Sequence, residues 1–541
     1  MIVMINRDLC CKAWKHDSSY PGIAGMRVKI IVNHDNHDNL RSYYLKNSYF
    51  RAPLKRFMFF NSIQFAIFLP IVFAIYWSIQ GKNIRQQNLL LLFASYYFYA
   101  CWDWRFLFLL IFSTFLDFYT GARIERANSA SSKKFWLWLS ICVNLGFLGF
   151  FKYYNFFISN FVDLFAGVGL HINSWTLKII LPVGISFYTF HGLSYVIDIY
   201  KGRISSEKNF IDYSLFVGFF PLLVAGPIER ATHLLPQVKT KRTFDYNEGV
   251  EGLKQILWGL FKKIVIADTC TELVNETFNN PTQYGGAMLV LGAVFFAFQI
   301  YCDFSGYSDI ALGTARLFGF RLLRNFAYPY FSRDIAEFWR RWHISLSSWF
   351  KDYLYIPLGG SKGGTWKKIR NTFIIFLVSG FWHGANWTFI AWGGLNALFI
   401  MPSIIFNTNR NNLDIVAKNK LLPSFRELLL MLTTFAMTCF AWIFFRSNSM
   451  HQAFSYIKNI FTGSFLKMPS AHLLKVGISC IASIFFLIIF EWRARDREFA
   501  LEGLPLGQRR TINWAFYSCL LIFIYKTATV VSDQQFIYFQ F

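Results

Sequence analysis

The segment from Ser379 to Trp387 holds a histidine where an ionisable side chain is costly. His383 lies between two long apolar runs, and glycines at 380 and 384 would let another helix or a substrate approach closely. A neutral imidazole can take a proton from a hydroxyl group. Asn386 follows three residues later and could orient the ring. The pattern fits a general base, and it also fits a histidine that is hydrogen-bonded in a protein core.

A second polar segment, from Tyr301 to Asp309, ends another apolar run. Its two carboxylates, Asp303 and Asp309, stand six residues apart. Polar residues in an apolar span favour a functional site, because burying them in lipid is expensive. Asp303 could line a cavity or form a structural pair, whereas Asp309 is expected to cap or pair a helix.

Between Arg316 and Arg370 the sequence turns basic, with eleven Lys and Arg residues against three acids. A helix starting at Ser332 would gather six apolar side chains on one arc of about 120°, with His343 at its edge. Such a helix is typical of a membrane interface, where tryptophan is enriched. The loop Gly359–Gly364 could wrap a phosphate through its backbone, or it could simply be flexible. The side chains of the arc are Phe338, Trp339, Trp342, Leu346, Trp349 and Phe350.

The signatures of soluble enzymes do not occur in this sequence. It has no G-x-x-x-x-G-K-[ST], no H-E-x-x-H, no G-x-S-x-G and no dinucleotide fingerprint. The nine cysteines form no C-x-x-C pair, so no disulfide framework is predicted. His34 and His37 form an H-x-x-H pair without supporting ligands, and no metal site is predicted. No serine or cysteine stands out as a nucleophile, but a base-activated alcohol can attack a thioester directly.

Long apolar runs must position these residues. The 541-residue chain is 55% apolar, 20% aromatic and 16% charged, with a mean hydropathy of +0.34, whereas soluble domains have about 25% charged residues. We expect an all-α polytopic membrane bundle of about 11 to 13 spans, each about 20 residues long. Stretches 250–267 and 305–320 could be tilted, re-entrant or interfacial. The predicted spans are 62–80, 87–101, 104–121, 135–158, 177–200, 211–226, 286–303, 371–386, 388–406, 427–446, 473–491 and 513–531.

The net charge of +24 would suit a nucleic-acid-binding protein, but no zinc-finger or RNA-binding signature supports that class. In a membrane protein the same excess collects in cytoplasmic loops. Basic loops follow the first, third and fifth predicted spans, which places the chain before Asn61 outside. The basic residues between 51 and 56 fit badly there. We therefore expect a polar N-terminal extension, 1–57, that is an upstream or dispensable segment, followed by a membrane domain, 58–541.

Several motifs together resemble the membrane-bound O-acyltransferase family, and within it the bacterial branch of the alginate O-acetyltransferase (AlgI) type. The resemblance extends from about Met58 to Phe541 and leaves residues 1–57 uncovered. The segments that carry it are Asn61–Phe65, Leu181–Phe190, Phe220–Ile228, Asp303–Asp309, Phe338–Leu346, Phe381–Gly384 and Phe536–Phe541.

The resemblance implies a ring of transmembrane helices around a thinned centre, with a tunnel between the two membrane faces. It implies that His383 is catalytic and that His343, nearer the cytoplasm, is a second important histidine. The acyl group, acetyl in this branch, would come from acetyl-CoA or another cytoplasmic thioester, and no bound cofactor is implied. It would pass to an exported polysaccharide such as alginate, with periplasmic acetyl-transfer proteins, from an enzyme of the bacterial inner membrane.

We expect five side chains to line the tunnel and three basic ones to dock the donor. The lining residues are Asp303, Ser305, Tyr307, Trp382 and Asn386, and the docking residues are Arg340, Arg341 and Lys362. The same chemistry could instead serve peptidoglycan, teichoic acid, a lipid or a protein, with D-alanyl from an acyl carrier protein as one variant. Buried His and Asp residues would also suit a transporter without a covalent step, and a scaffold of an export complex is a further alternative.

Overall fold

The computed structural model describes residues 58–541 apart from gaps at 80–82, 171–172, 174, 225, 463, 468, 504–509, 531–535 and 538–541. By their internal contacts, Met1–Arg56 and Phe57–Phe541 are separate units. The predictions made for residues 1–57, including the N-terminal extension and the His34–His37 pair, lie outside the described residues. The end of the closing motif lies outside them as well.

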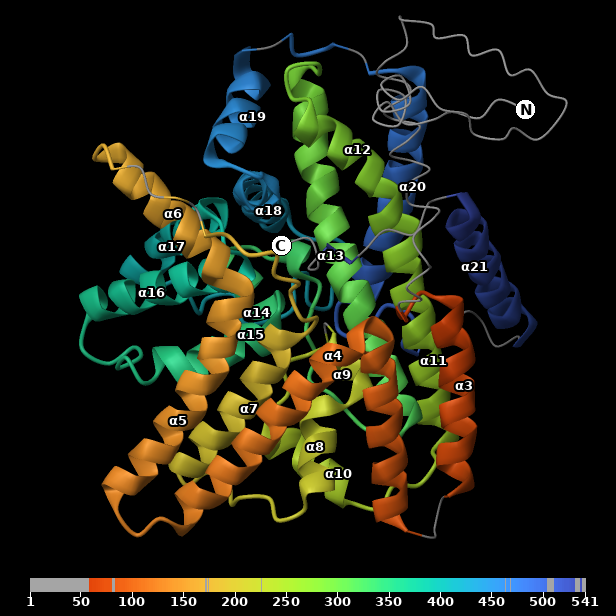
Figure 1. Cartoon of the computed structure of the whole chain (residues 1–541). Helices are drawn as coiled ribbons and strands as arrows, with labels where there is room; N and C mark the ends of the chain where they lie inside the picture. Colours follow the sequence, from red (N-terminus) through yellow and green to blue (C-terminus); the bar gives the residue numbers. More distant parts are fainter. Residues whose placement is uncertain are drawn as a thin grey trace, which may run out of the picture. The chain divides into compact units, whose positions relative to one another are not determined.

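Every regular element in the described residues is a helix, which confirms the all-α prediction (Figure 1). The first half contains α3 (Ile63–Ser78), α4 (Ile84–Arg126), α5 (Ala130–Leu148), η1 (Gly149–Tyr153), α6 (Tyr154–Gly167), α7 (Ile185–Tyr200), α8 (Phe210–Gly218), α9 (Phe220–Leu223), α10 (Ala231–Lys239), α11 (Tyr246–Leu260), η2 (Phe261–Ala267) and α12 (Asp268–Asn279). The second half contains α13 (Gly286–Leu317), η3 (Pro329–Phe331), α14 (Ile335–Arg341), α15 (Ile344–Phe350), η4 (Lys351–Tyr355), α16 (Thr365–His383), α17 (Trp387–Ile405), α18 (Phe425–Arg446), α19 (Met450–Thr462), α20 (Ala471–Arg493) and α21 (Arg510–Val530).

Six helical segments of the described chain are long and apolar enough to cross a membrane: α4, α5 through α6, α13, α17, α18 and α20. They confirm a multi-pass membrane protein. The predicted count of 11 to 13 is higher, partly because predicted neighbours merge. The 43 residues of α4 extend about 65 Å at 1.5 Å per residue, twice the roughly 30 Å of a hydrocarbon core. A kink at Asp103, with φ −157°, divides α4 where two spans were predicted.

α13 is buried along most of its length and packs against α11 through glycine (Figure 1). Gly252 and Gly259 of α11 meet Gly313 and Gly306 of α13. A methyl group on Gly259 would lie 2.5 Å from the carbonyl oxygen of Gly306, and one on Gly252 would lie 2.7 Å from that of Gly313. The two backbones therefore touch, and no larger residue fits at the contact.

Directly after this contact, α11 continues as the π-helix η2, which presents two adjacent lysines to α13. Lys262 Nζ lies 2.6 Å from Asp309, and Lys263 Nζ lies 2.7 Å from Asp303. Both lysines and Asp303 are buried. A buried charge that loses its partner is strongly destabilising, so these pairs fix the register of η2 on α13. Asp303 thus takes part in the structural pairing that was one of its two expected roles.

The basic segment does not form the single interfacial helix expected from its periodicity. α14 starts after Asp334, whose side chain accepts a hydrogen bond from Glu337 N at 2.7 Å, rather than at Ser332, and it has only seven residues. The chain then breaks at His343, which has left-handed φ 44° and ψ 55°, before α15 begins. Most of the predicted aromatic arc is buried. These rings pack inside the protein because the chain changes direction at His343, and tertiary hydrogen bonds stabilise that change.

Candidate active site

His383 is the last residue of α16, and it is only 4% exposed. Its ring packs edge to face against three aromatic rings. The centroid distances are 4.9 Å to Trp382, 5.2 Å to Trp392 and 5.4 Å to Phe445. The imidazole therefore lies in a largely aromatic environment.

α16 and α17 form a hairpin whose close approach depends on glycine. The backbone of Phe389 lies against Gly380, and the ring of the same residue lies against Gly384. The two glycines that flank His383 thus allow the close approach of another helix, which was expected as an alternative to the approach of a substrate. Side chains at either position would push α17 away from the histidine.

Asn386 does not lie on the helix that carries His383. It begins α17, where its side chain accepts a hydrogen bond from Thr388 N at 3.1 Å and donates one to Asn448 O at 2.8 Å. The expectation of a residue one helical turn from the histidine is wrong, because α16 ends at His383. The sequence contains no proline that would have marked this break.

The end of α16 is capped by the π-helix η1. The last carbonyl groups of a helix lack partners within it. Here Lys152 Nζ donates to Trp382 O at 2.6 Å and to His383 O at 2.9 Å, and Tyr153 Oη donates to Phe381 O at 2.9 Å. The sequence analysis missed both residues. The signal was available, since Lys152 is the only charged residue in the predicted span 135–158.

His343, at the break between α14 and α15, is 1% exposed. Its ring centroid lies 4.7 Å from that of Phe304 and 6.2 Å from that of Trp382. The Trp382 ring therefore contacts both histidines that the sequence singled out. Behind His343 lies Asn325, whose Oδ1 is 3.3 Å from His343 Nδ1. No sequence signal pointed to Asn325, which follows α13 in an irregular loop.

The other expected lining residues of α13 make different contacts. Ser305 Oγ accepts a hydrogen bond from Lys262 Nζ at 2.9 Å. The Tyr307 ring stacks on Phe60 at 4.5 Å and packs against Phe536 at 4.9 Å. With the Asp303 ion pair, these contacts tie α13 to η2 and to the two ends of the described chain. Among the five expected lining residues, Trp382 contacts both histidine rings.

The expected docking residues Arg340 and Arg341 line one surface pocket of about 330 Å³. Arg340 donates to two backbone carbonyls of the loop after α17, Asn409 O at 2.7 Å and Asn412 O at 2.8 Å. Lys362 is exposed in its glycine-rich loop and does not line this pocket. The charged residues that line it are Arg324, Arg340, Arg341, Arg495, Glu337, Asp414 and Asp496.

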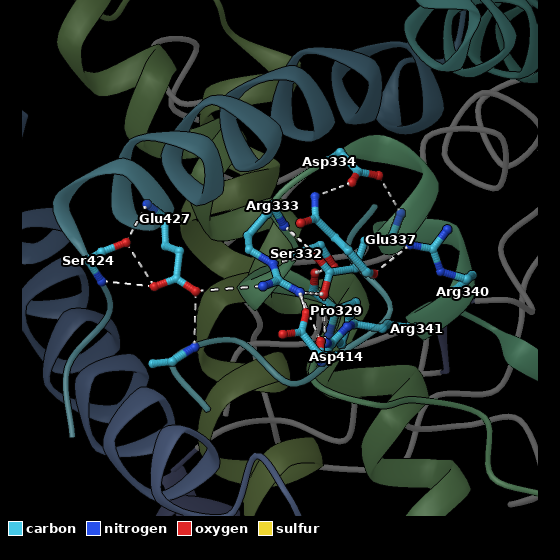
Figure 2. Close-up of polar contacts among 12 residues, drawn as sticks. Pro329, Ser332, Arg333, Asp334, Glu337, Arg340, Arg341, Asp414, Ser424 and Glu427 are labelled. Carbon is cyan, nitrogen blue, oxygen red and sulfur yellow. Dashed lines mark hydrogen bonds and ion pairs between the residues drawn. The ribbon is translucent and has the colours of Figure 1, made fainter. Parts of the chain in front are cut away.

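Figure 2 shows a network of ion pairs, here called the charged hub, and three of its members, Glu337, Arg341 and Asp414, also line this pocket. Its members are Arg333, Glu337, Arg341, Asp414 and Glu427. The Glu337 carboxylate accepts from Arg333 Nε at 3.1 Å and from Arg341 Nη2 at 2.6 Å, and Arg333 Nη2 donates to Asp414 Oδ1 at 2.9 Å. The hub joins α14, the loop before α18 and the first turn of α18.

Two further histidines near predicted spans, His191 and His233, both contact Glu229. His191 Nε2 accepts a hydrogen bond from Glu229 N at 3.1 Å, and His233 Nδ1 lies 2.8 Å from the Glu229 carboxylate. That hydrogen bond raises the pKa of His233 above its usual value. In the part of the chain that the structure describes, no three His, Cys, Asp or Glu residues cluster closely enough to hold a metal ion.

Comparison of the sequence with those of known proteins matches the chain to one family. The family model described as MBOAT, membrane-bound O-acyltransferase family, matches residues 201–418. A protein of Pseudomonas aeruginosa named probable alginate O-acetylase AlgI is 37% identical, covering 80% of this chain and 81% of its own length. The protein of the same name from Pseudomonas syringae is 39% identical over 73% of each chain. The peptidoglycan O-acetyltransferase of Helicobacter pylori is 36% identical, covering 74% and 80%.

Proposed function

This chain belongs to the membrane-bound O-acyltransferase family and is a multi-pass bacterial O-acyltransferase, and from that premise we propose that it O-acetylates an exported polysaccharide such as alginate. The similarity to proteins named alginate O-acetylases over 73 to 80% of the chain supports both the acetyl group and the polysaccharide acceptor. Residues 58–541 would form the acyltransferase domain.

The observation that carries the proposal is a pair of buried histidines whose rings share contact with Trp382. His383 acts as general base toward the acceptor. It takes the proton of the hydroxyl, the oxygen attacks the thioester carbonyl carbon, the C–S bond breaks, and the thiolate takes up the proton. In the alternative course, His383 attacks first and carries the acyl group to the hydroxyl.

The surroundings of His383 suit this chemistry. Its aromatic neighbours exclude water, which would otherwise hydrolyse the thioester. Lys152 and Tyr153 hold the end of α16 in place through its carbonyl groups. A fixed base favours transfer because the reacting atoms must be held in a narrow range of geometry.

The donor would bind at the surface pocket that Arg340 and Arg341 line, whose charged side chains are four arginines and three carboxylates. The pocket of Arg340 and Arg341 and the loop of Lys362 offer positive charge to the phosphates of acetyl-CoA or to an acidic acyl carrier protein. The donor is a substrate, so the reaction needs no bound cofactor. Acetyl-transfer proteins on the far side of the membrane would complete delivery to the polymer.

The test is transfer of label from radiolabelled acetyl-CoA in membranes that hold the full chain, followed by isolation of the exopolysaccharide. We expect label in the polymer with wild type, and none with His383→Ala or His343→Ala at matched protein levels. His472→Ala is the control, because His472 is an exposed residue paired with Glu272. Full transfer by the His383 variant would contradict the assigned base. No transfer by wild type from acetyl-CoA or from an acetylated carrier protein would contradict the function.

A second acceptor is supported by one comparison. The peptidoglycan O-acetyltransferase of Helicobacter pylori covers 74% of the chain at 36% identity, close to the values for the alginate O-acetylases. Separation of the labelled envelope into exopolysaccharide and peptidoglycan distinguishes the two acceptors. Label in peptidoglycan alone would show that peptidoglycan, and not the exopolysaccharide, is the acceptor. The proposed acyl transfer would still hold.

A further inference from the structure

Asn325 lies directly behind His343 and is 1% exposed. Both ends of its side-chain amide are engaged. Oδ1 accepts a hydrogen bond from Ser345 Oγ at 2.6 Å and lies 3.3 Å from His343 Nδ1. Nδ2 donates to Ser308 Oγ at 3.1 Å. The amide therefore links α13, the loop that follows it and the break between α14 and α15.

Ser345 contacts the end of the Asn325 amide that faces the histidine. Its Oγ accepts a hydrogen bond from Ile228 N at 3.0 Å, and its own hydroxyl proton points to Asn325 Oδ1. With the amide reversed, the NH₂ group would face that hydroxyl proton. The hydrogen-bond pattern, which is the criterion by which such amides are assigned, thus places the oxygen of Asn325 against His343.

The orientation of the amide decides the tautomer of His343. A nitrogen that faces a carbonyl oxygen must carry a proton, and a neutral imidazole has only one N–H. With Nδ1 protonated, Nε2 keeps its lone pair. Nε2 is buried, and within the described residues it has no hydrogen-bond partner. It is therefore available to accept a hydrogen bond from a substrate.

The backbone of the same loop holds the left-handed turn. Asn325 O accepts from Ile344 N at 2.9 Å, and Ala327 N donates to Arg341 O at 2.9 Å. These two bonds bracket His343, whose φ of 44° few non-glycine residues adopt. Asn325 thus acts on His343 through both its main chain and its side chain.

We propose that Asn325 is a positioning residue that fixes the tautomer of His343, with the proton on Nδ1, so that Nε2 accepts a hydrogen bond from a donor group of the bound substrate other than the reacting hydroxyl, whose proton His383 takes. The inference rests on the proposed acyl transfer and adds the group that orients its second histidine.

Few ionisable groups near His343 could imitate this effect. Across the Trp382 ring lies His383, and Lys152 lies beside His383 at the end of α16. On its other side Asn325 lines a small pocket with the ionisable side chains of Lys262, Asp309, Arg324, Glu491 and Glu498, of which Lys262 and Asp309 pair with each other. Because Asn325 Oδ1 lies 3.3 Å from His343 Nδ1, a change of charge at position 325 should alter the protonation of His343 directly.

The test compares Asn325→Asp, Asn325→Ala and Ser345→Ala in the full chain, with acetyl-CoA as donor and the exopolysaccharide as acceptor. Asn325→Asp keeps the shape and the acceptor atom but adds a charge that favours the imidazolium. We expect the acid limb of its kcat profile to move up by about 1 to 3 pH units, with near wild-type kcat above it. Asn325→Ala should lose about 10- to 100-fold in kcat, the size of effect known for hydrogen-bond partners of metal-bound histidines, with the KM for acetyl-CoA within about twofold. Ser345→Ala, which frees the amide to turn, should lose less than Asn325→Ala.

Asn396→Asp is the matched control, because Asn396 is a buried amide that bonds Trp339 and the Trp392 carbonyl. Its acid limb should stay at the wild-type pH. A wild-type acid limb in Asn325→Asp, wild-type kcat in Asn325→Ala, or a folded Asn325→Asp that is inactive at every pH would each overturn the proposal. Absence of transfer by wild type would instead contradict the proposed function.

Discussion

α14 joins two regions of opposite character. At its start and along one side lies the charged hub, in which five ionised side chains pair across three elements (Figure 2). Just beyond its end lies the histidine site, which consists of His343, His383 and the Trp382 ring that contacts both of them. The hub is rich in charge, and the histidine site is walled by aromatic rings.

The difference shows how α14 can be held firmly by ion pairs that lie away from the rings of the two histidines. Buried ion pairs fix geometry, but a nearby charge also biases the protonation of an imidazole. The hub is confined to the side of α14 that faces the loop before α18. Hydrogen bonds from neutral groups, such as Asn325 and Ser345, complete the positioning at the site. We therefore expect the hub to govern stability and the site to govern turnover.

The largest expected effect comes from His383→Gln. Loss of the general base should lower kcat by about 10² to 10⁴-fold, while the thermal midpoint of the purified protein stays near that of wild type. Label transfer and thermal unfolding in detergent measure the two quantities. His472→Gln is the control. A large fall in thermal midpoint without a fall in kcat would reverse the roles assigned to the two regions.

Glu337→Gln should have the next largest effect, on stability. Glu337 is 1% exposed and accepts hydrogen bonds from Arg333, which precedes α14, and from Arg341 at the end of α14. Breaking a buried pair by removing one charge costs about 3 to 5 kcal/mol, so the thermal midpoint should fall strongly. The folded fraction should retain near wild-type kcat. Loss of kcat in a variant with an unchanged midpoint would show that the hub acts on catalysis.

Lys152→Met should give a smaller effect at the histidine site. It removes two charge-assisted hydrogen bonds to the carbonyls at the end of α16, each worth about 1.5 to 3 kcal/mol. Because the loss displaces His383, we expect kcat to fall about 10- to 100-fold. Lys152→Arg, which keeps the charge, should recover part of the rate. Equal rates in the Met variant and wild type would exclude a positioning role for Lys152.

Asp414→Asn should have the smallest effect. The Asp414 side chain is 55% exposed, and such ion pairs contribute about 0 to 1 kcal/mol and weaken with salt. We expect a small drop in thermal midpoint at low ionic strength and none at high salt. A drop as large as that of Glu337→Gln would mean that the hub is a single cooperative unit.

The sequence predicted the features that depend on composition and left out those that depend on distant contacts. The all-α membrane fold follows from the apolar runs, and His383 stands out because it interrupts two of them. The break at His343 could not be predicted, because the helical periodicity of the aromatic arc continues through it. Two hydrogen bonds to a loop that is distant in sequence bracket the left-handed turn, from Ile344 N to Asn325 O and from Ala327 N to Arg341 O.

Asn386 illustrates the same limit at the other histidine. Its spacing from His383 suggested a shared helical face, but α16 ends at the histidine because η1 supplies hydrogen-bond donors to its carbonyls. That cap comes from a segment about 230 residues earlier in the chain. Residue spacing predicts which side chains are neighbours if the helix continues. It does not show where hydrogen-bond donors from a distant segment cap the helix and so mark its end.

The paired lysines of η2 have a consequence for how the protein is made. Lys262 leaves the ribosome before Asp309, the carboxylate that pairs with it, whereas Lys263 pairs both with Asp268, five residues later, and with Asp303 of α13. A lysine at the centre of a helix in lipid costs about 2.5 to 3.5 kcal/mol on insertion scales. The α11–η2 segment is therefore a poor candidate for independent release from the translocon. It is expected to wait there for α13 and to enter the bilayer with it, as a preassembled pair joined along the glycine contact.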